Sequence, residues 1–284
     1  MTFCSIEGRI CQMICPLINS HQYYDSMTMQ PLEPQVFQSV RLIATDMDGT
    51  LTQQGKFTPA LLQALTALDK AGIQVLIITG RSAGWMNGIV SYLPVVGAIA
   101  ENGGILYRNG TAPNGAEPEL LVPLDLSCHR QQLADMFAQL KAEFPQIQTS
   151  IDNQFRLTDW TFDVFGLSIA DIHRLRDRCL AQGWGFTYST VQCHIKSLQQ
   201  DKAMGLCRTL SQYFPYAPQE IVTVGDSPND ESLFQPDRFP LSVGVANVQH
   251  YLNQLQHKPA YRTEAAESEG FCELAKLLIQ SAGR

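Results

Sequence analysis

The sequence predicts an α/β protein with a doubly wound (Rossmann-like) parallel-sheet core and an inserted α+β domain. Two observations carry this prediction. In residues 39–120 and 198–284, short apolar runs that end in polar loops alternate with amphipathic helical segments. In residues 121–197 this alternation stops, and two helical segments are separated by several strand-like segments. Apolar strands that alternate with helices are typical of a parallel sheet covered on both faces.

The first part of the core is predicted to contain four strands and one helix. Four apolar runs indicate the strands: residues 40–45, 74–78, 95–100 and 105–107. Thr58 followed by Pro59 is typical of a helix start, and Gly72 of a helix end, so a helix should connect the first two strands. The pair Asn109-Gly110 predicts a hairpin turn.

Further helices and strands are predicted in the inserted segment, residues 121–197, and in the second part of the core, residues 198–284. Within the insert, helical periodicity indicates helices at residues 127–144 and 170–182. Strands are expected there at residues 148–157, 161–167, 186–189 and 192–196. The core then resumes with a helix at residues 201–213, strands at 220–224 and 241–245, and a closing helix at 270–282.

Domain boundaries follow from this order. The core comprises residues 39–120 and 198–284, and the insert comprises residues 121–197. Residues 1–38 show no sustained hydrophobic period and contain Pro16, Pro31 and Pro34, so they are interpreted as a loose N-terminal arm.

Composition excludes several classes of partner. A net charge of −7 argues against a general nucleic-acid binder. The longest uncharged run, residues 82–100, contains three glycines and a proline, so we expect no membrane-spanning segment. The eight cysteines include no Cys-x-x-Cys pair, which favours free thiols and a cytoplasmic location. The oligomeric state is left open.

Three predicted strands end in polar segments, at residues 46–51, 79–82 and 225–230. Ligands of open α/β sheets bind beyond the carboxyl ends of the strands, so these segments should meet at one edge. Four carboxylates would meet there: Asp46, Asp48, Asp226 and Asp230. Such a cluster needs a cation, and oxygen ligands favour Mg²⁺. Polar and cationic side chains suited to a phosphoryl group accompany them: Thr79, Arg81, Ser82 and Lys202.

These segments carry a family resemblance. Asp46-Met-Asp-Gly-Thr-Leu-Thr52, Thr79, Lys202 and Gly225-Asp-Ser-Pro-Asn-Asp230 resemble, in order, the four motifs of the haloacid dehalogenase-like hydrolases. The insert, and Glu101-Asn-Gly-Gly104, resemble the subfamily that contains the Cof-type, sucrose-phosphate and trehalose-phosphate phosphatases, in which such an insert is a cap domain (C2-type). One departure is Ala203, where many relatives have glycine after the lysine.

The resemblance implies a role for each motif residue. Asp46 would be the nucleophile that forms an aspartyl-phosphate, and Asp48 the general acid and base. Mg²⁺ would be held by the Asp46 carboxylate, the Asp48 main-chain carbonyl and Asp226, with Asp230 and Asn229 supporting the metal and Lys202. Thr79 and Lys202 would hold the phosphate. The predicted substrate-binding residues are Thr79, Gly80, Arg81, Lys202 and Asn229.

The expected activity is Mg²⁺-dependent hydrolysis of a small phosphorylated metabolite, such as a sugar phosphate. A phosphohexomutase and a non-catalytic phosphometabolite-binding protein are the alternatives. Lys196 lies close to Lys202 in sequence and competes for its role, although Lys202 opens a helix and is preferred. Arg81 fits a surface salt bridge as well as a substrate contact.

Some residues of the insert fit the substrate pocket as well as a structural role. Asn153, Arg156, Trp160 and His194 are interpreted as structural. Tyr188 and Gln192 stay ambiguous.

Overall fold

The computed structural model of the protein describes residues 29–109, 118–123, 125–189 and 191–282. The first 28 residues of the predicted N-terminal arm, and Gly110 of the predicted hairpin turn, lie outside the described residues. Among the described residues, no helix is both long and apolar enough to cross a membrane.

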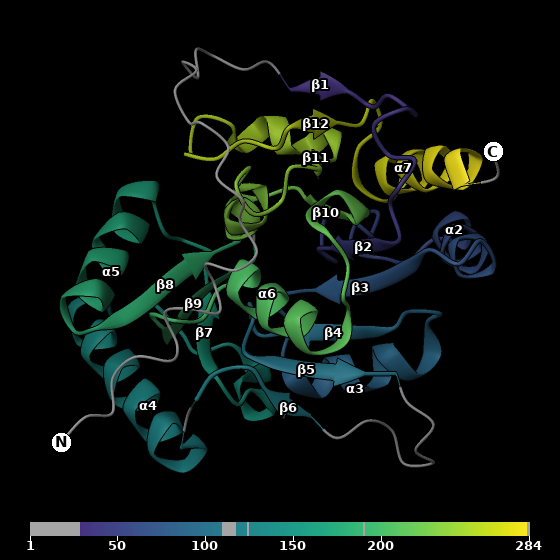
Figure 1. Cartoon of the computed structure of the whole chain (residues 1–284). Coiled ribbons are helices and arrows are strands. Elements are labelled where there is room, and N and C mark those ends of the chain that lie inside the picture. Colours follow the sequence, from purple (N-terminus) through teal and green to yellow (C-terminus); the bar gives the residue numbers. More distant parts are fainter. Residues whose placement is uncertain (1–28, 110–117, 124, 190, 283–284) are drawn as a thin grey trace, which may run out of the picture.

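Within the described residues, the core contains a nine-stranded sheet in the order β1-β12-β11-β10-β2-β3-β4-β5-β6 (Figure 1). All neighbours from β1 to β4 are parallel, whereas β5 and β6 pair antiparallel at one end. The strands are β1 (Gln30–Pro31), β2 (Leu42–Thr45), β3 (Gln74–Ile78), β4 (Gly97–Ala100), β5 (Ile105–Arg108), β6 (Glu119–Leu120), β10 (Ile221–Gly225), β11 (Ser242–Gly244) and β12 (Tyr261–Arg262). The predicted fold class is confirmed.

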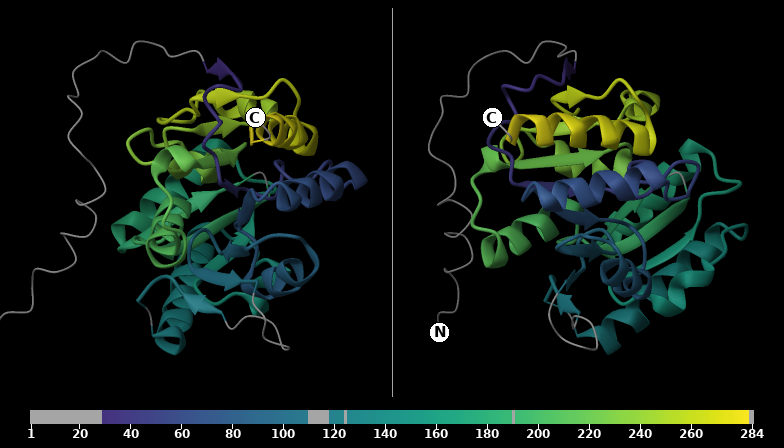
Figure 2. Two further views of the ribbon diagram at one scale, coloured as in Figure 1. Left: turned by 45° about the vertical axis from the view of Figure 1, so that its right-hand side comes forward. Right: turned by 90° about the vertical axis from the view of Figure 1, so that its right-hand side faces the viewer.

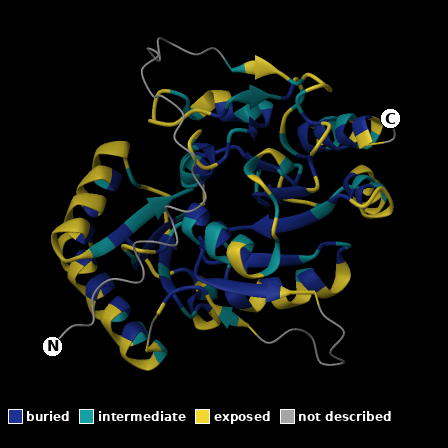
Figure 3. Ribbon diagram, in the orientation of Figure 1, coloured by how far each residue is buried: buried dark blue, intermediate teal, exposed yellow. Residues whose placement is uncertain are grey.

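Helices cover both faces of this sheet. One face packs against α2 (Pro59–Lys70), α3 (Ala83–Tyr92) and α7 (Glu267–Ala282), and the other against α6 (Lys202–Tyr213). Figure 2 shows α2 and α7 side by side on the first face. The central strand β2 packs against the helices on both faces of the sheet. Ile43 belongs to the apolar cluster on the face covered by α2, α3 and α7, whereas Leu42 and Ala44 belong to the cluster on the face covered by α6. The sheet is therefore buried throughout its centre (Figure 3).

The sequence analysis did not predict α3. This helix contains Gly84 and Gly88, which weaken helix propensity, and the side chain of its N-cap residue Ser82 makes no capping hydrogen bond. Tertiary packing stabilises the helix instead, since Met86 and Val90 are buried against the sheet.

The insert forms its own α+β layer. A three-stranded antiparallel sheet has the order β7-β9-β8, and it packs against α4 (Leu126–Glu143) and α5 (Ile169–Ala181) through a separate apolar cluster. The strands are β7 (Asp159–Asp163), β8 (Trp184–Tyr188) and β9 (Gln192–Ser197). In Figure 1 this unit, which we call the cap, lies beside the carboxyl end of the central strands.

One predicted element of the cap is wrong. Residues 148–157 do not form a strand but contain the 3-10 helix η1 (Ile151–Phe155). The Asn153 side chain donates to the main-chain carbonyls of Ser150 and Thr161, at 3.2 and 2.5 Å. Such local side-chain hydrogen bonds favour a turn over a strand. The strand predicted at residues 161–167 begins earlier, at Asp159, and ends at Asp163.

The described end of the N-terminal arm contacts the core. β1 pairs in parallel with β12, and Phe37 is 1% exposed, with its ring 5.1 Å from that of Tyr261. Ordered packing thus begins before residue 39. The division into arm, core and cap otherwise stays a prediction.

Candidate active site

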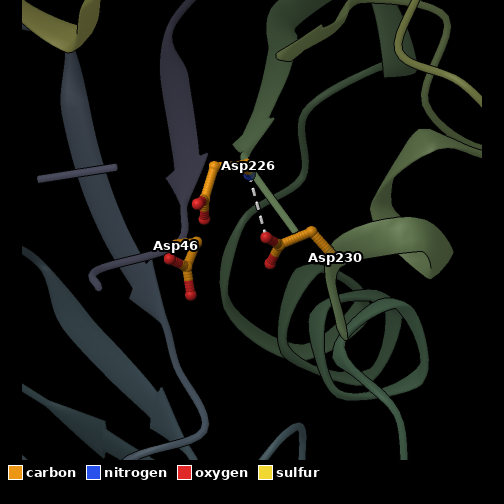
Figure 4. Close-up of side chains that lie close together, drawn as sticks. All are labelled: Asp46, Asp226 and Asp230. Atoms are coloured by element: carbon orange, nitrogen blue, oxygen red, sulfur yellow. Dashed lines mark hydrogen bonds between the residues drawn. The ribbon is translucent and has the colours of Figure 1, made fainter. Parts of the chain in front are cut away.

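The central strands β2 and β10 bring three carboxylates together. Asp46 directly follows β2 and Asp226 directly follows β10, and the two strands pair in parallel, so both residues leave the sheet at the same edge. Asp230 lies four residues further on, in the 3-10 helix η3 (Pro228–Phe234). Ligand oxygens of the three side chains lie within 4.8 Å of one another (Figure 4).

Lys202 lies against this cluster. Its Nζ donates to Asp46 Oδ1 at 2.5 Å and to Asp230 Oδ1 at 2.6 Å. Burial alone would lower the pKa of Lys202, but Asp230 and Asp46 raise it overall, so the ammonium stays charged. Of the two lysines that compete in the sequence analysis, the structure places Lys202, and not Lys196, against the nucleophile candidate.

The acidic cluster has the electrostatic properties of a cation site. Burial and then Asp230 raise the pKa of Asp46 to about 7, and burial and then Asp46 raise the pKa of Asp226 well above its usual range. Asp46 Oδ2 is buried and has no hydrogen-bond partner among the described residues. A divalent cation would relieve the repulsion and satisfy this oxygen. The residues present therefore fit Mg²⁺.

Asp230 is held by both of its oxygens. Oδ1 accepts from Lys202, and Oδ2 accepts from the main-chain N–H groups of Asp226 and Ser227, at 3.0 and 3.1 Å. This geometry makes Asp230 a link between the lysine and the loop that carries Asp226. Because both oxygens of Asp230 accept hydrogen bonds, this geometry agrees with a role in positioning the metal ligands rather than with direct coordination of the metal by Asp230.

Gly49 and Asn247 fix the position of Asp226. Gly49 has φ +85°, and a Cβ atom there would lie 2.5 Å from Asp226 Oδ2. Asn247 Nδ2 donates to the same oxygen at 2.8 Å and to the Gly49 carbonyl at 3.0 Å. The sequence analysis missed Asn247. It follows β11, so the rule that functional side chains follow the carboxyl ends of parallel strands could have found it.

Asp48 lies apart from the acidic cluster and pairs with Arg81. Arg81 Nε and Nη2 donate to the two carboxylate oxygens, at 2.8 and 2.7 Å. The guanidinium also lies over the ring of Trp85, 4.7 Å from its centroid. Thr79 is 1% exposed, and its hydroxyl accepts from the Arg81 main-chain N–H at 3.1 Å.

A narrow cavity of about 30 Å³ lies over this site and is lined by both core and cap. The core contributes Asp46, Asp48, Gly80, Arg81, Ser227 and Asn229, and the cap contributes Ser189, Val191, Gln192 and His194. Asp46 and Asp48, the two predicted catalytic aspartates, therefore face a space that the cap also lines. Asn229 also accepts a hydrogen bond from the Ser227 hydroxyl at 2.6 Å, within its own loop.

The cap residues divide between structural and pocket positions. Asn153 orders the turn described above, and the Trp160 ring stacks on Phe137 with centroids 5.7 Å apart. Tyr188 donates to Gln254 at 2.8 Å, which links the cap to the core. His194, interpreted as structural from the sequence, lines the narrow cavity beside Gln192.

A buried arginine, held by two carboxylates of the cap, joins the cap to the core beside the site. The Arg156 side chain is fully buried and donates to Asp159, to Asp152 and to the main-chain carbonyl of Gly80. Asp159 Oδ2 lies 2.8 Å from His194 Nδ1 and accepts its hydrogen. The arrangement fixes Gly80 in the core and the His194 ring in the cap relative to each other.

The segment Glu101-Asn-Gly-Gly104 is the junction between core and cap. Glu101 is fully buried and accepts hydrogen bonds from the main-chain N–H groups of Ala83, Leu157 and Thr158. Gly103 has φ +100°, and a Cβ atom there would lie 2.0 Å from the Asp201 carbonyl oxygen, next to Lys202. From the sequence, this segment was expected to form the turn after the strand at residues 95–100 and to resemble the subfamily, and its contact with the cap was not predicted.

Comparison with known proteins supports this description. A sequence model of the haloacid dehalogenase-like hydrolases matches residues 43–114. Phosphoglycolate phosphatase 1 of Saccharolobus solfataricus is 26% identical over 245 residues, which cover 85% of this chain and 96% of that protein. Phosphoglycolate phosphatase of Thermoplasma acidophilum is 23% identical over 198 residues, covering 69% and 81%.

Solved structures share the fold. A Thermoplasma acidophilum protein superposes with a TM-score of 0.67 at 20% identity, covering 85% of this chain and 99% of that one. The sucrose-phosphatase of Synechocystis has a TM-score of 0.60 at 16% identity, covering 84% and 97%. The sequence model over residues 43–114 and the curated relatives agree that this chain is similar to haloacid dehalogenase-like hydrolases, and the solved structures show that it shares their fold.

Proposed function

We propose that this chain is a Mg²⁺-dependent phosphatase that hydrolyses a small phosphorylated metabolite through an aspartyl-phosphate on Asp46. The observation that carries the proposal is the contact of Asp46 with Lys202 beside two further buried carboxylates. A cationic donor and a cation site next to one carboxylate favour attack on phosphorus, since neutralisation of phosphate charge dominates phosphoryl transfer. The names of the curated relatives support a phosphatase.

The proposed reaction has two steps. A carboxylate oxygen of Asp46 forms a bond to phosphorus while the ester P–O bond breaks, and Asp48 gives a proton to the leaving oxygen. Asp48 then takes a proton from water as the water oxygen bonds to phosphorus, and the Asp46–phosphorus bond breaks to release phosphate. Lys202 and Thr79 hold the phosphoryl oxygens throughout.

Asp46, Asp226 and the Asp48 main-chain carbonyl would hold Mg²⁺, with Asp230 and Asn247 fixing their positions. When bound, this ion supplies charge neutralisation that allows one anion to approach another. The raised pKa of Asp46 agrees with this assignment, because a buried carboxylate without a cation holds its proton more tightly.

The cavity over the aspartates bounds the phosphoryl end of the substrate. It holds only about 30 Å³ beside Asp46 and Asp48, so the rest of a bound substrate must extend beyond it. Sugar phosphates stay a prediction, and the names of the curated relatives make phosphoglycolate the first compound to test. A cytoplasmic location is also proposed, on the cysteine content alone.

The test is hydrolysis of p-nitrophenyl phosphate by the purified protein. Activity is expected with Mg²⁺ and not with EDTA, and Asp46→Asn should remove it without unfolding the protein. Mg²⁺ should also raise the Tm of the parent by several degrees, and that of Asp226→Asn by much less. Turnover by Asp46→Asn at the parental rate would refute the nucleophile assignment.

A further inference from the structure

One face of the strand β9 carries polar side chains that point toward the core. Side chains alternate between the two faces of a strand, and Cys193 and Ile195 belong to the apolar cluster of the cap. The opposite face carries Gln192, His194 and Lys196. The first two line the narrow cavity over the catalytic aspartates. The third member of the row, Lys196, therefore projects into the same interface between cap and core.

Lys196 lines a second and larger cavity, of about 270 Å³. Lys202 and Asn229 line it from the core, and Asn229 lines the narrow cavity as well. Asn102, also in the second cavity, has its amide nitrogen 3.2 Å from His194 Nδ1. The two cavities thus share a wall. A ligand whose phosphoryl group is held at Lys202 has room for its remaining atoms in the second cavity.

The ammonium group of Lys196 has no carboxylate in ion-pair contact among the described residues, although the charges of Asp201 and then Asp159 act on it from further away. Lys196 is 7% exposed, and its Nζ donates to the main-chain carbonyl of Gln200. Burial lowers the pKa of Lys196, and the negative charges of Asp201 and then Asp159 offset only part of this effect. An ammonium has three hydrogens to donate, so at least one more acceptor fits here.

The acidic residues of this cavity already have other partners. Asp201 caps α6 by accepting from the Met204 main-chain N–H at 2.7 Å. Glu231 accepts from two main-chain N–H groups, those of Gln256 and His257, at 2.9 and 3.1 Å. An anion brought in by a ligand would therefore find Lys196 as a cationic partner.

We propose that Lys196 binds a carboxylate on the leaving group of the substrate. The preferred substrates would then be phosphorylated hydroxy acids, in which the phosphoryl group binds at Lys202 and the carboxylate at Lys196. This inference rests on the proposed function and adds to it a binding residue and a substrate class. Charge-assisted hydrogen bonds of this kind are stronger than neutral ones, so the preference should be measurable.

The test compares substrates that differ only in the carboxylate. One pair is 2-phosphoglycolate and 2-hydroxyethyl phosphate, and the other is 3-phosphoglycerate and glycerol 3-phosphate. In Lys196→Met, kcat/KM for at least one carboxylate ester should fall roughly 10- to 100-fold, while its alcohol partner changes less than about 3-fold. Lys196→Arg keeps the charge and should retain most of the preference.

Lys141→Met is the matched control, because Lys141 is an exposed lysine on α4 of the same cap. It removes the same net charge and should leave both pairs unchanged. If kcat/KM falls equally for both members of each pair, Lys196 has a structural role through its hydrogen bond to Gln200. If kcat/KM does not fall for any ester, Lys196 does not contact the substrate. Either result overturns the proposal.

A binding measurement separates this proposal from the proposed function. Calorimetry with the Asp46→Asn variant measures the Kd of 2-phosphoglycolate and 3-phosphoglycerate without turnover. Adding Lys196→Met should weaken binding of at least one of them roughly 10-fold or more. If the parent hydrolyses neither p-nitrophenyl phosphate nor any of the four esters, the phosphatase proposal fails, and this measurement still decides whether Lys196 binds a carboxylate.

Discussion

Arg81 binds Asp48 through two parallel hydrogen bonds, of 2.8 and 2.7 Å, while its guanidinium lies over Trp85. The pair joins the loop after β2 to the loop after β3. Asp48 is thereby oriented by a neighbouring strand rather than by its own loop alone. A bidentate arginine–carboxylate pair fixes direction as well as distance, which a lysine does not.

We expect Arg81→Lys to lower kcat by roughly 10-fold and Arg81→Met by roughly 100-fold, because Asp48 loses its orientation. Stability should change by less than about 1 kcal/mol, since the pair is partly exposed. Steady-state kinetics and urea unfolding measure the two effects. Unchanged kcat in both variants would support the other interpretation of Arg81, a surface salt bridge.

Gly49→Ala should lower catalytic activity more than it lowers the stability of the fold. At φ +85° any side chain is strained, by about 1–2 kcal/mol, and here a Cβ atom would also lie 2.5 Å from Asp226 Oδ2. We expect kcat/KM to fall roughly 100-fold and the affinity for Mg²⁺ to fall with it. Activity assays at varied Mg²⁺ concentration measure both.

Gly55→Ala is the matched control for this substitution. Gly55 has φ +73° in the same part of the chain, but nothing lies within 4 Å of a Cβ atom built there. It should lose a similar amount of stability and keep its kcat. Equal kinetic losses in the two variants would show that backbone strain, and not the contact with Asp226, explains the effect.

Glu101 should make the stability of the protein depend on pH. Burial and then Asp159 raise the pKa of Glu101 from 4.5 to about 7. The folded state therefore binds this proton more tightly than the unfolded state. The contribution to the free energy of unfolding is fully present below pH 4.5 and falls as the pH rises toward 7, by roughly 3 kcal/mol in all.

Urea unfolding of the parent and of Glu101→Gln, from pH 4.5 to 8, measures this contribution. The free energy of unfolding of the parent minus that of the variant should decrease across this range, because the neutral amide does not titrate. A difference that rises with pH would mean that the N–H groups of Leu157 and Thr158 stabilise the carboxylate more than burial destabilises it.

The sequence by itself determined the core strands longer than two residues and the loops that follow them, but not the short strands β1, β6 and β12. Apolar runs such as residues 74–78 have no stable alternative to burial, and parallel pairing places their carboxyl ends at one edge. For this reason Asp46, Asp226 and Asp230 could be expected together before any contact was known. The role of Lys202 followed from the family resemblance, and its place at the start of a helix favoured it over Lys196.

Only the tertiary structure decided what each of these side chains contacts. The helix α3 and the turn at Asn153 depend on packing and on local side-chain hydrogen bonds that outweigh propensity and pattern. The positions of His194 and Lys196 over the site depend on how the cap sits on the core. Contacts between elements distant in the chain are fixed by strand register, side-chain rotamer and the docking of two layers, and no local pattern encodes these.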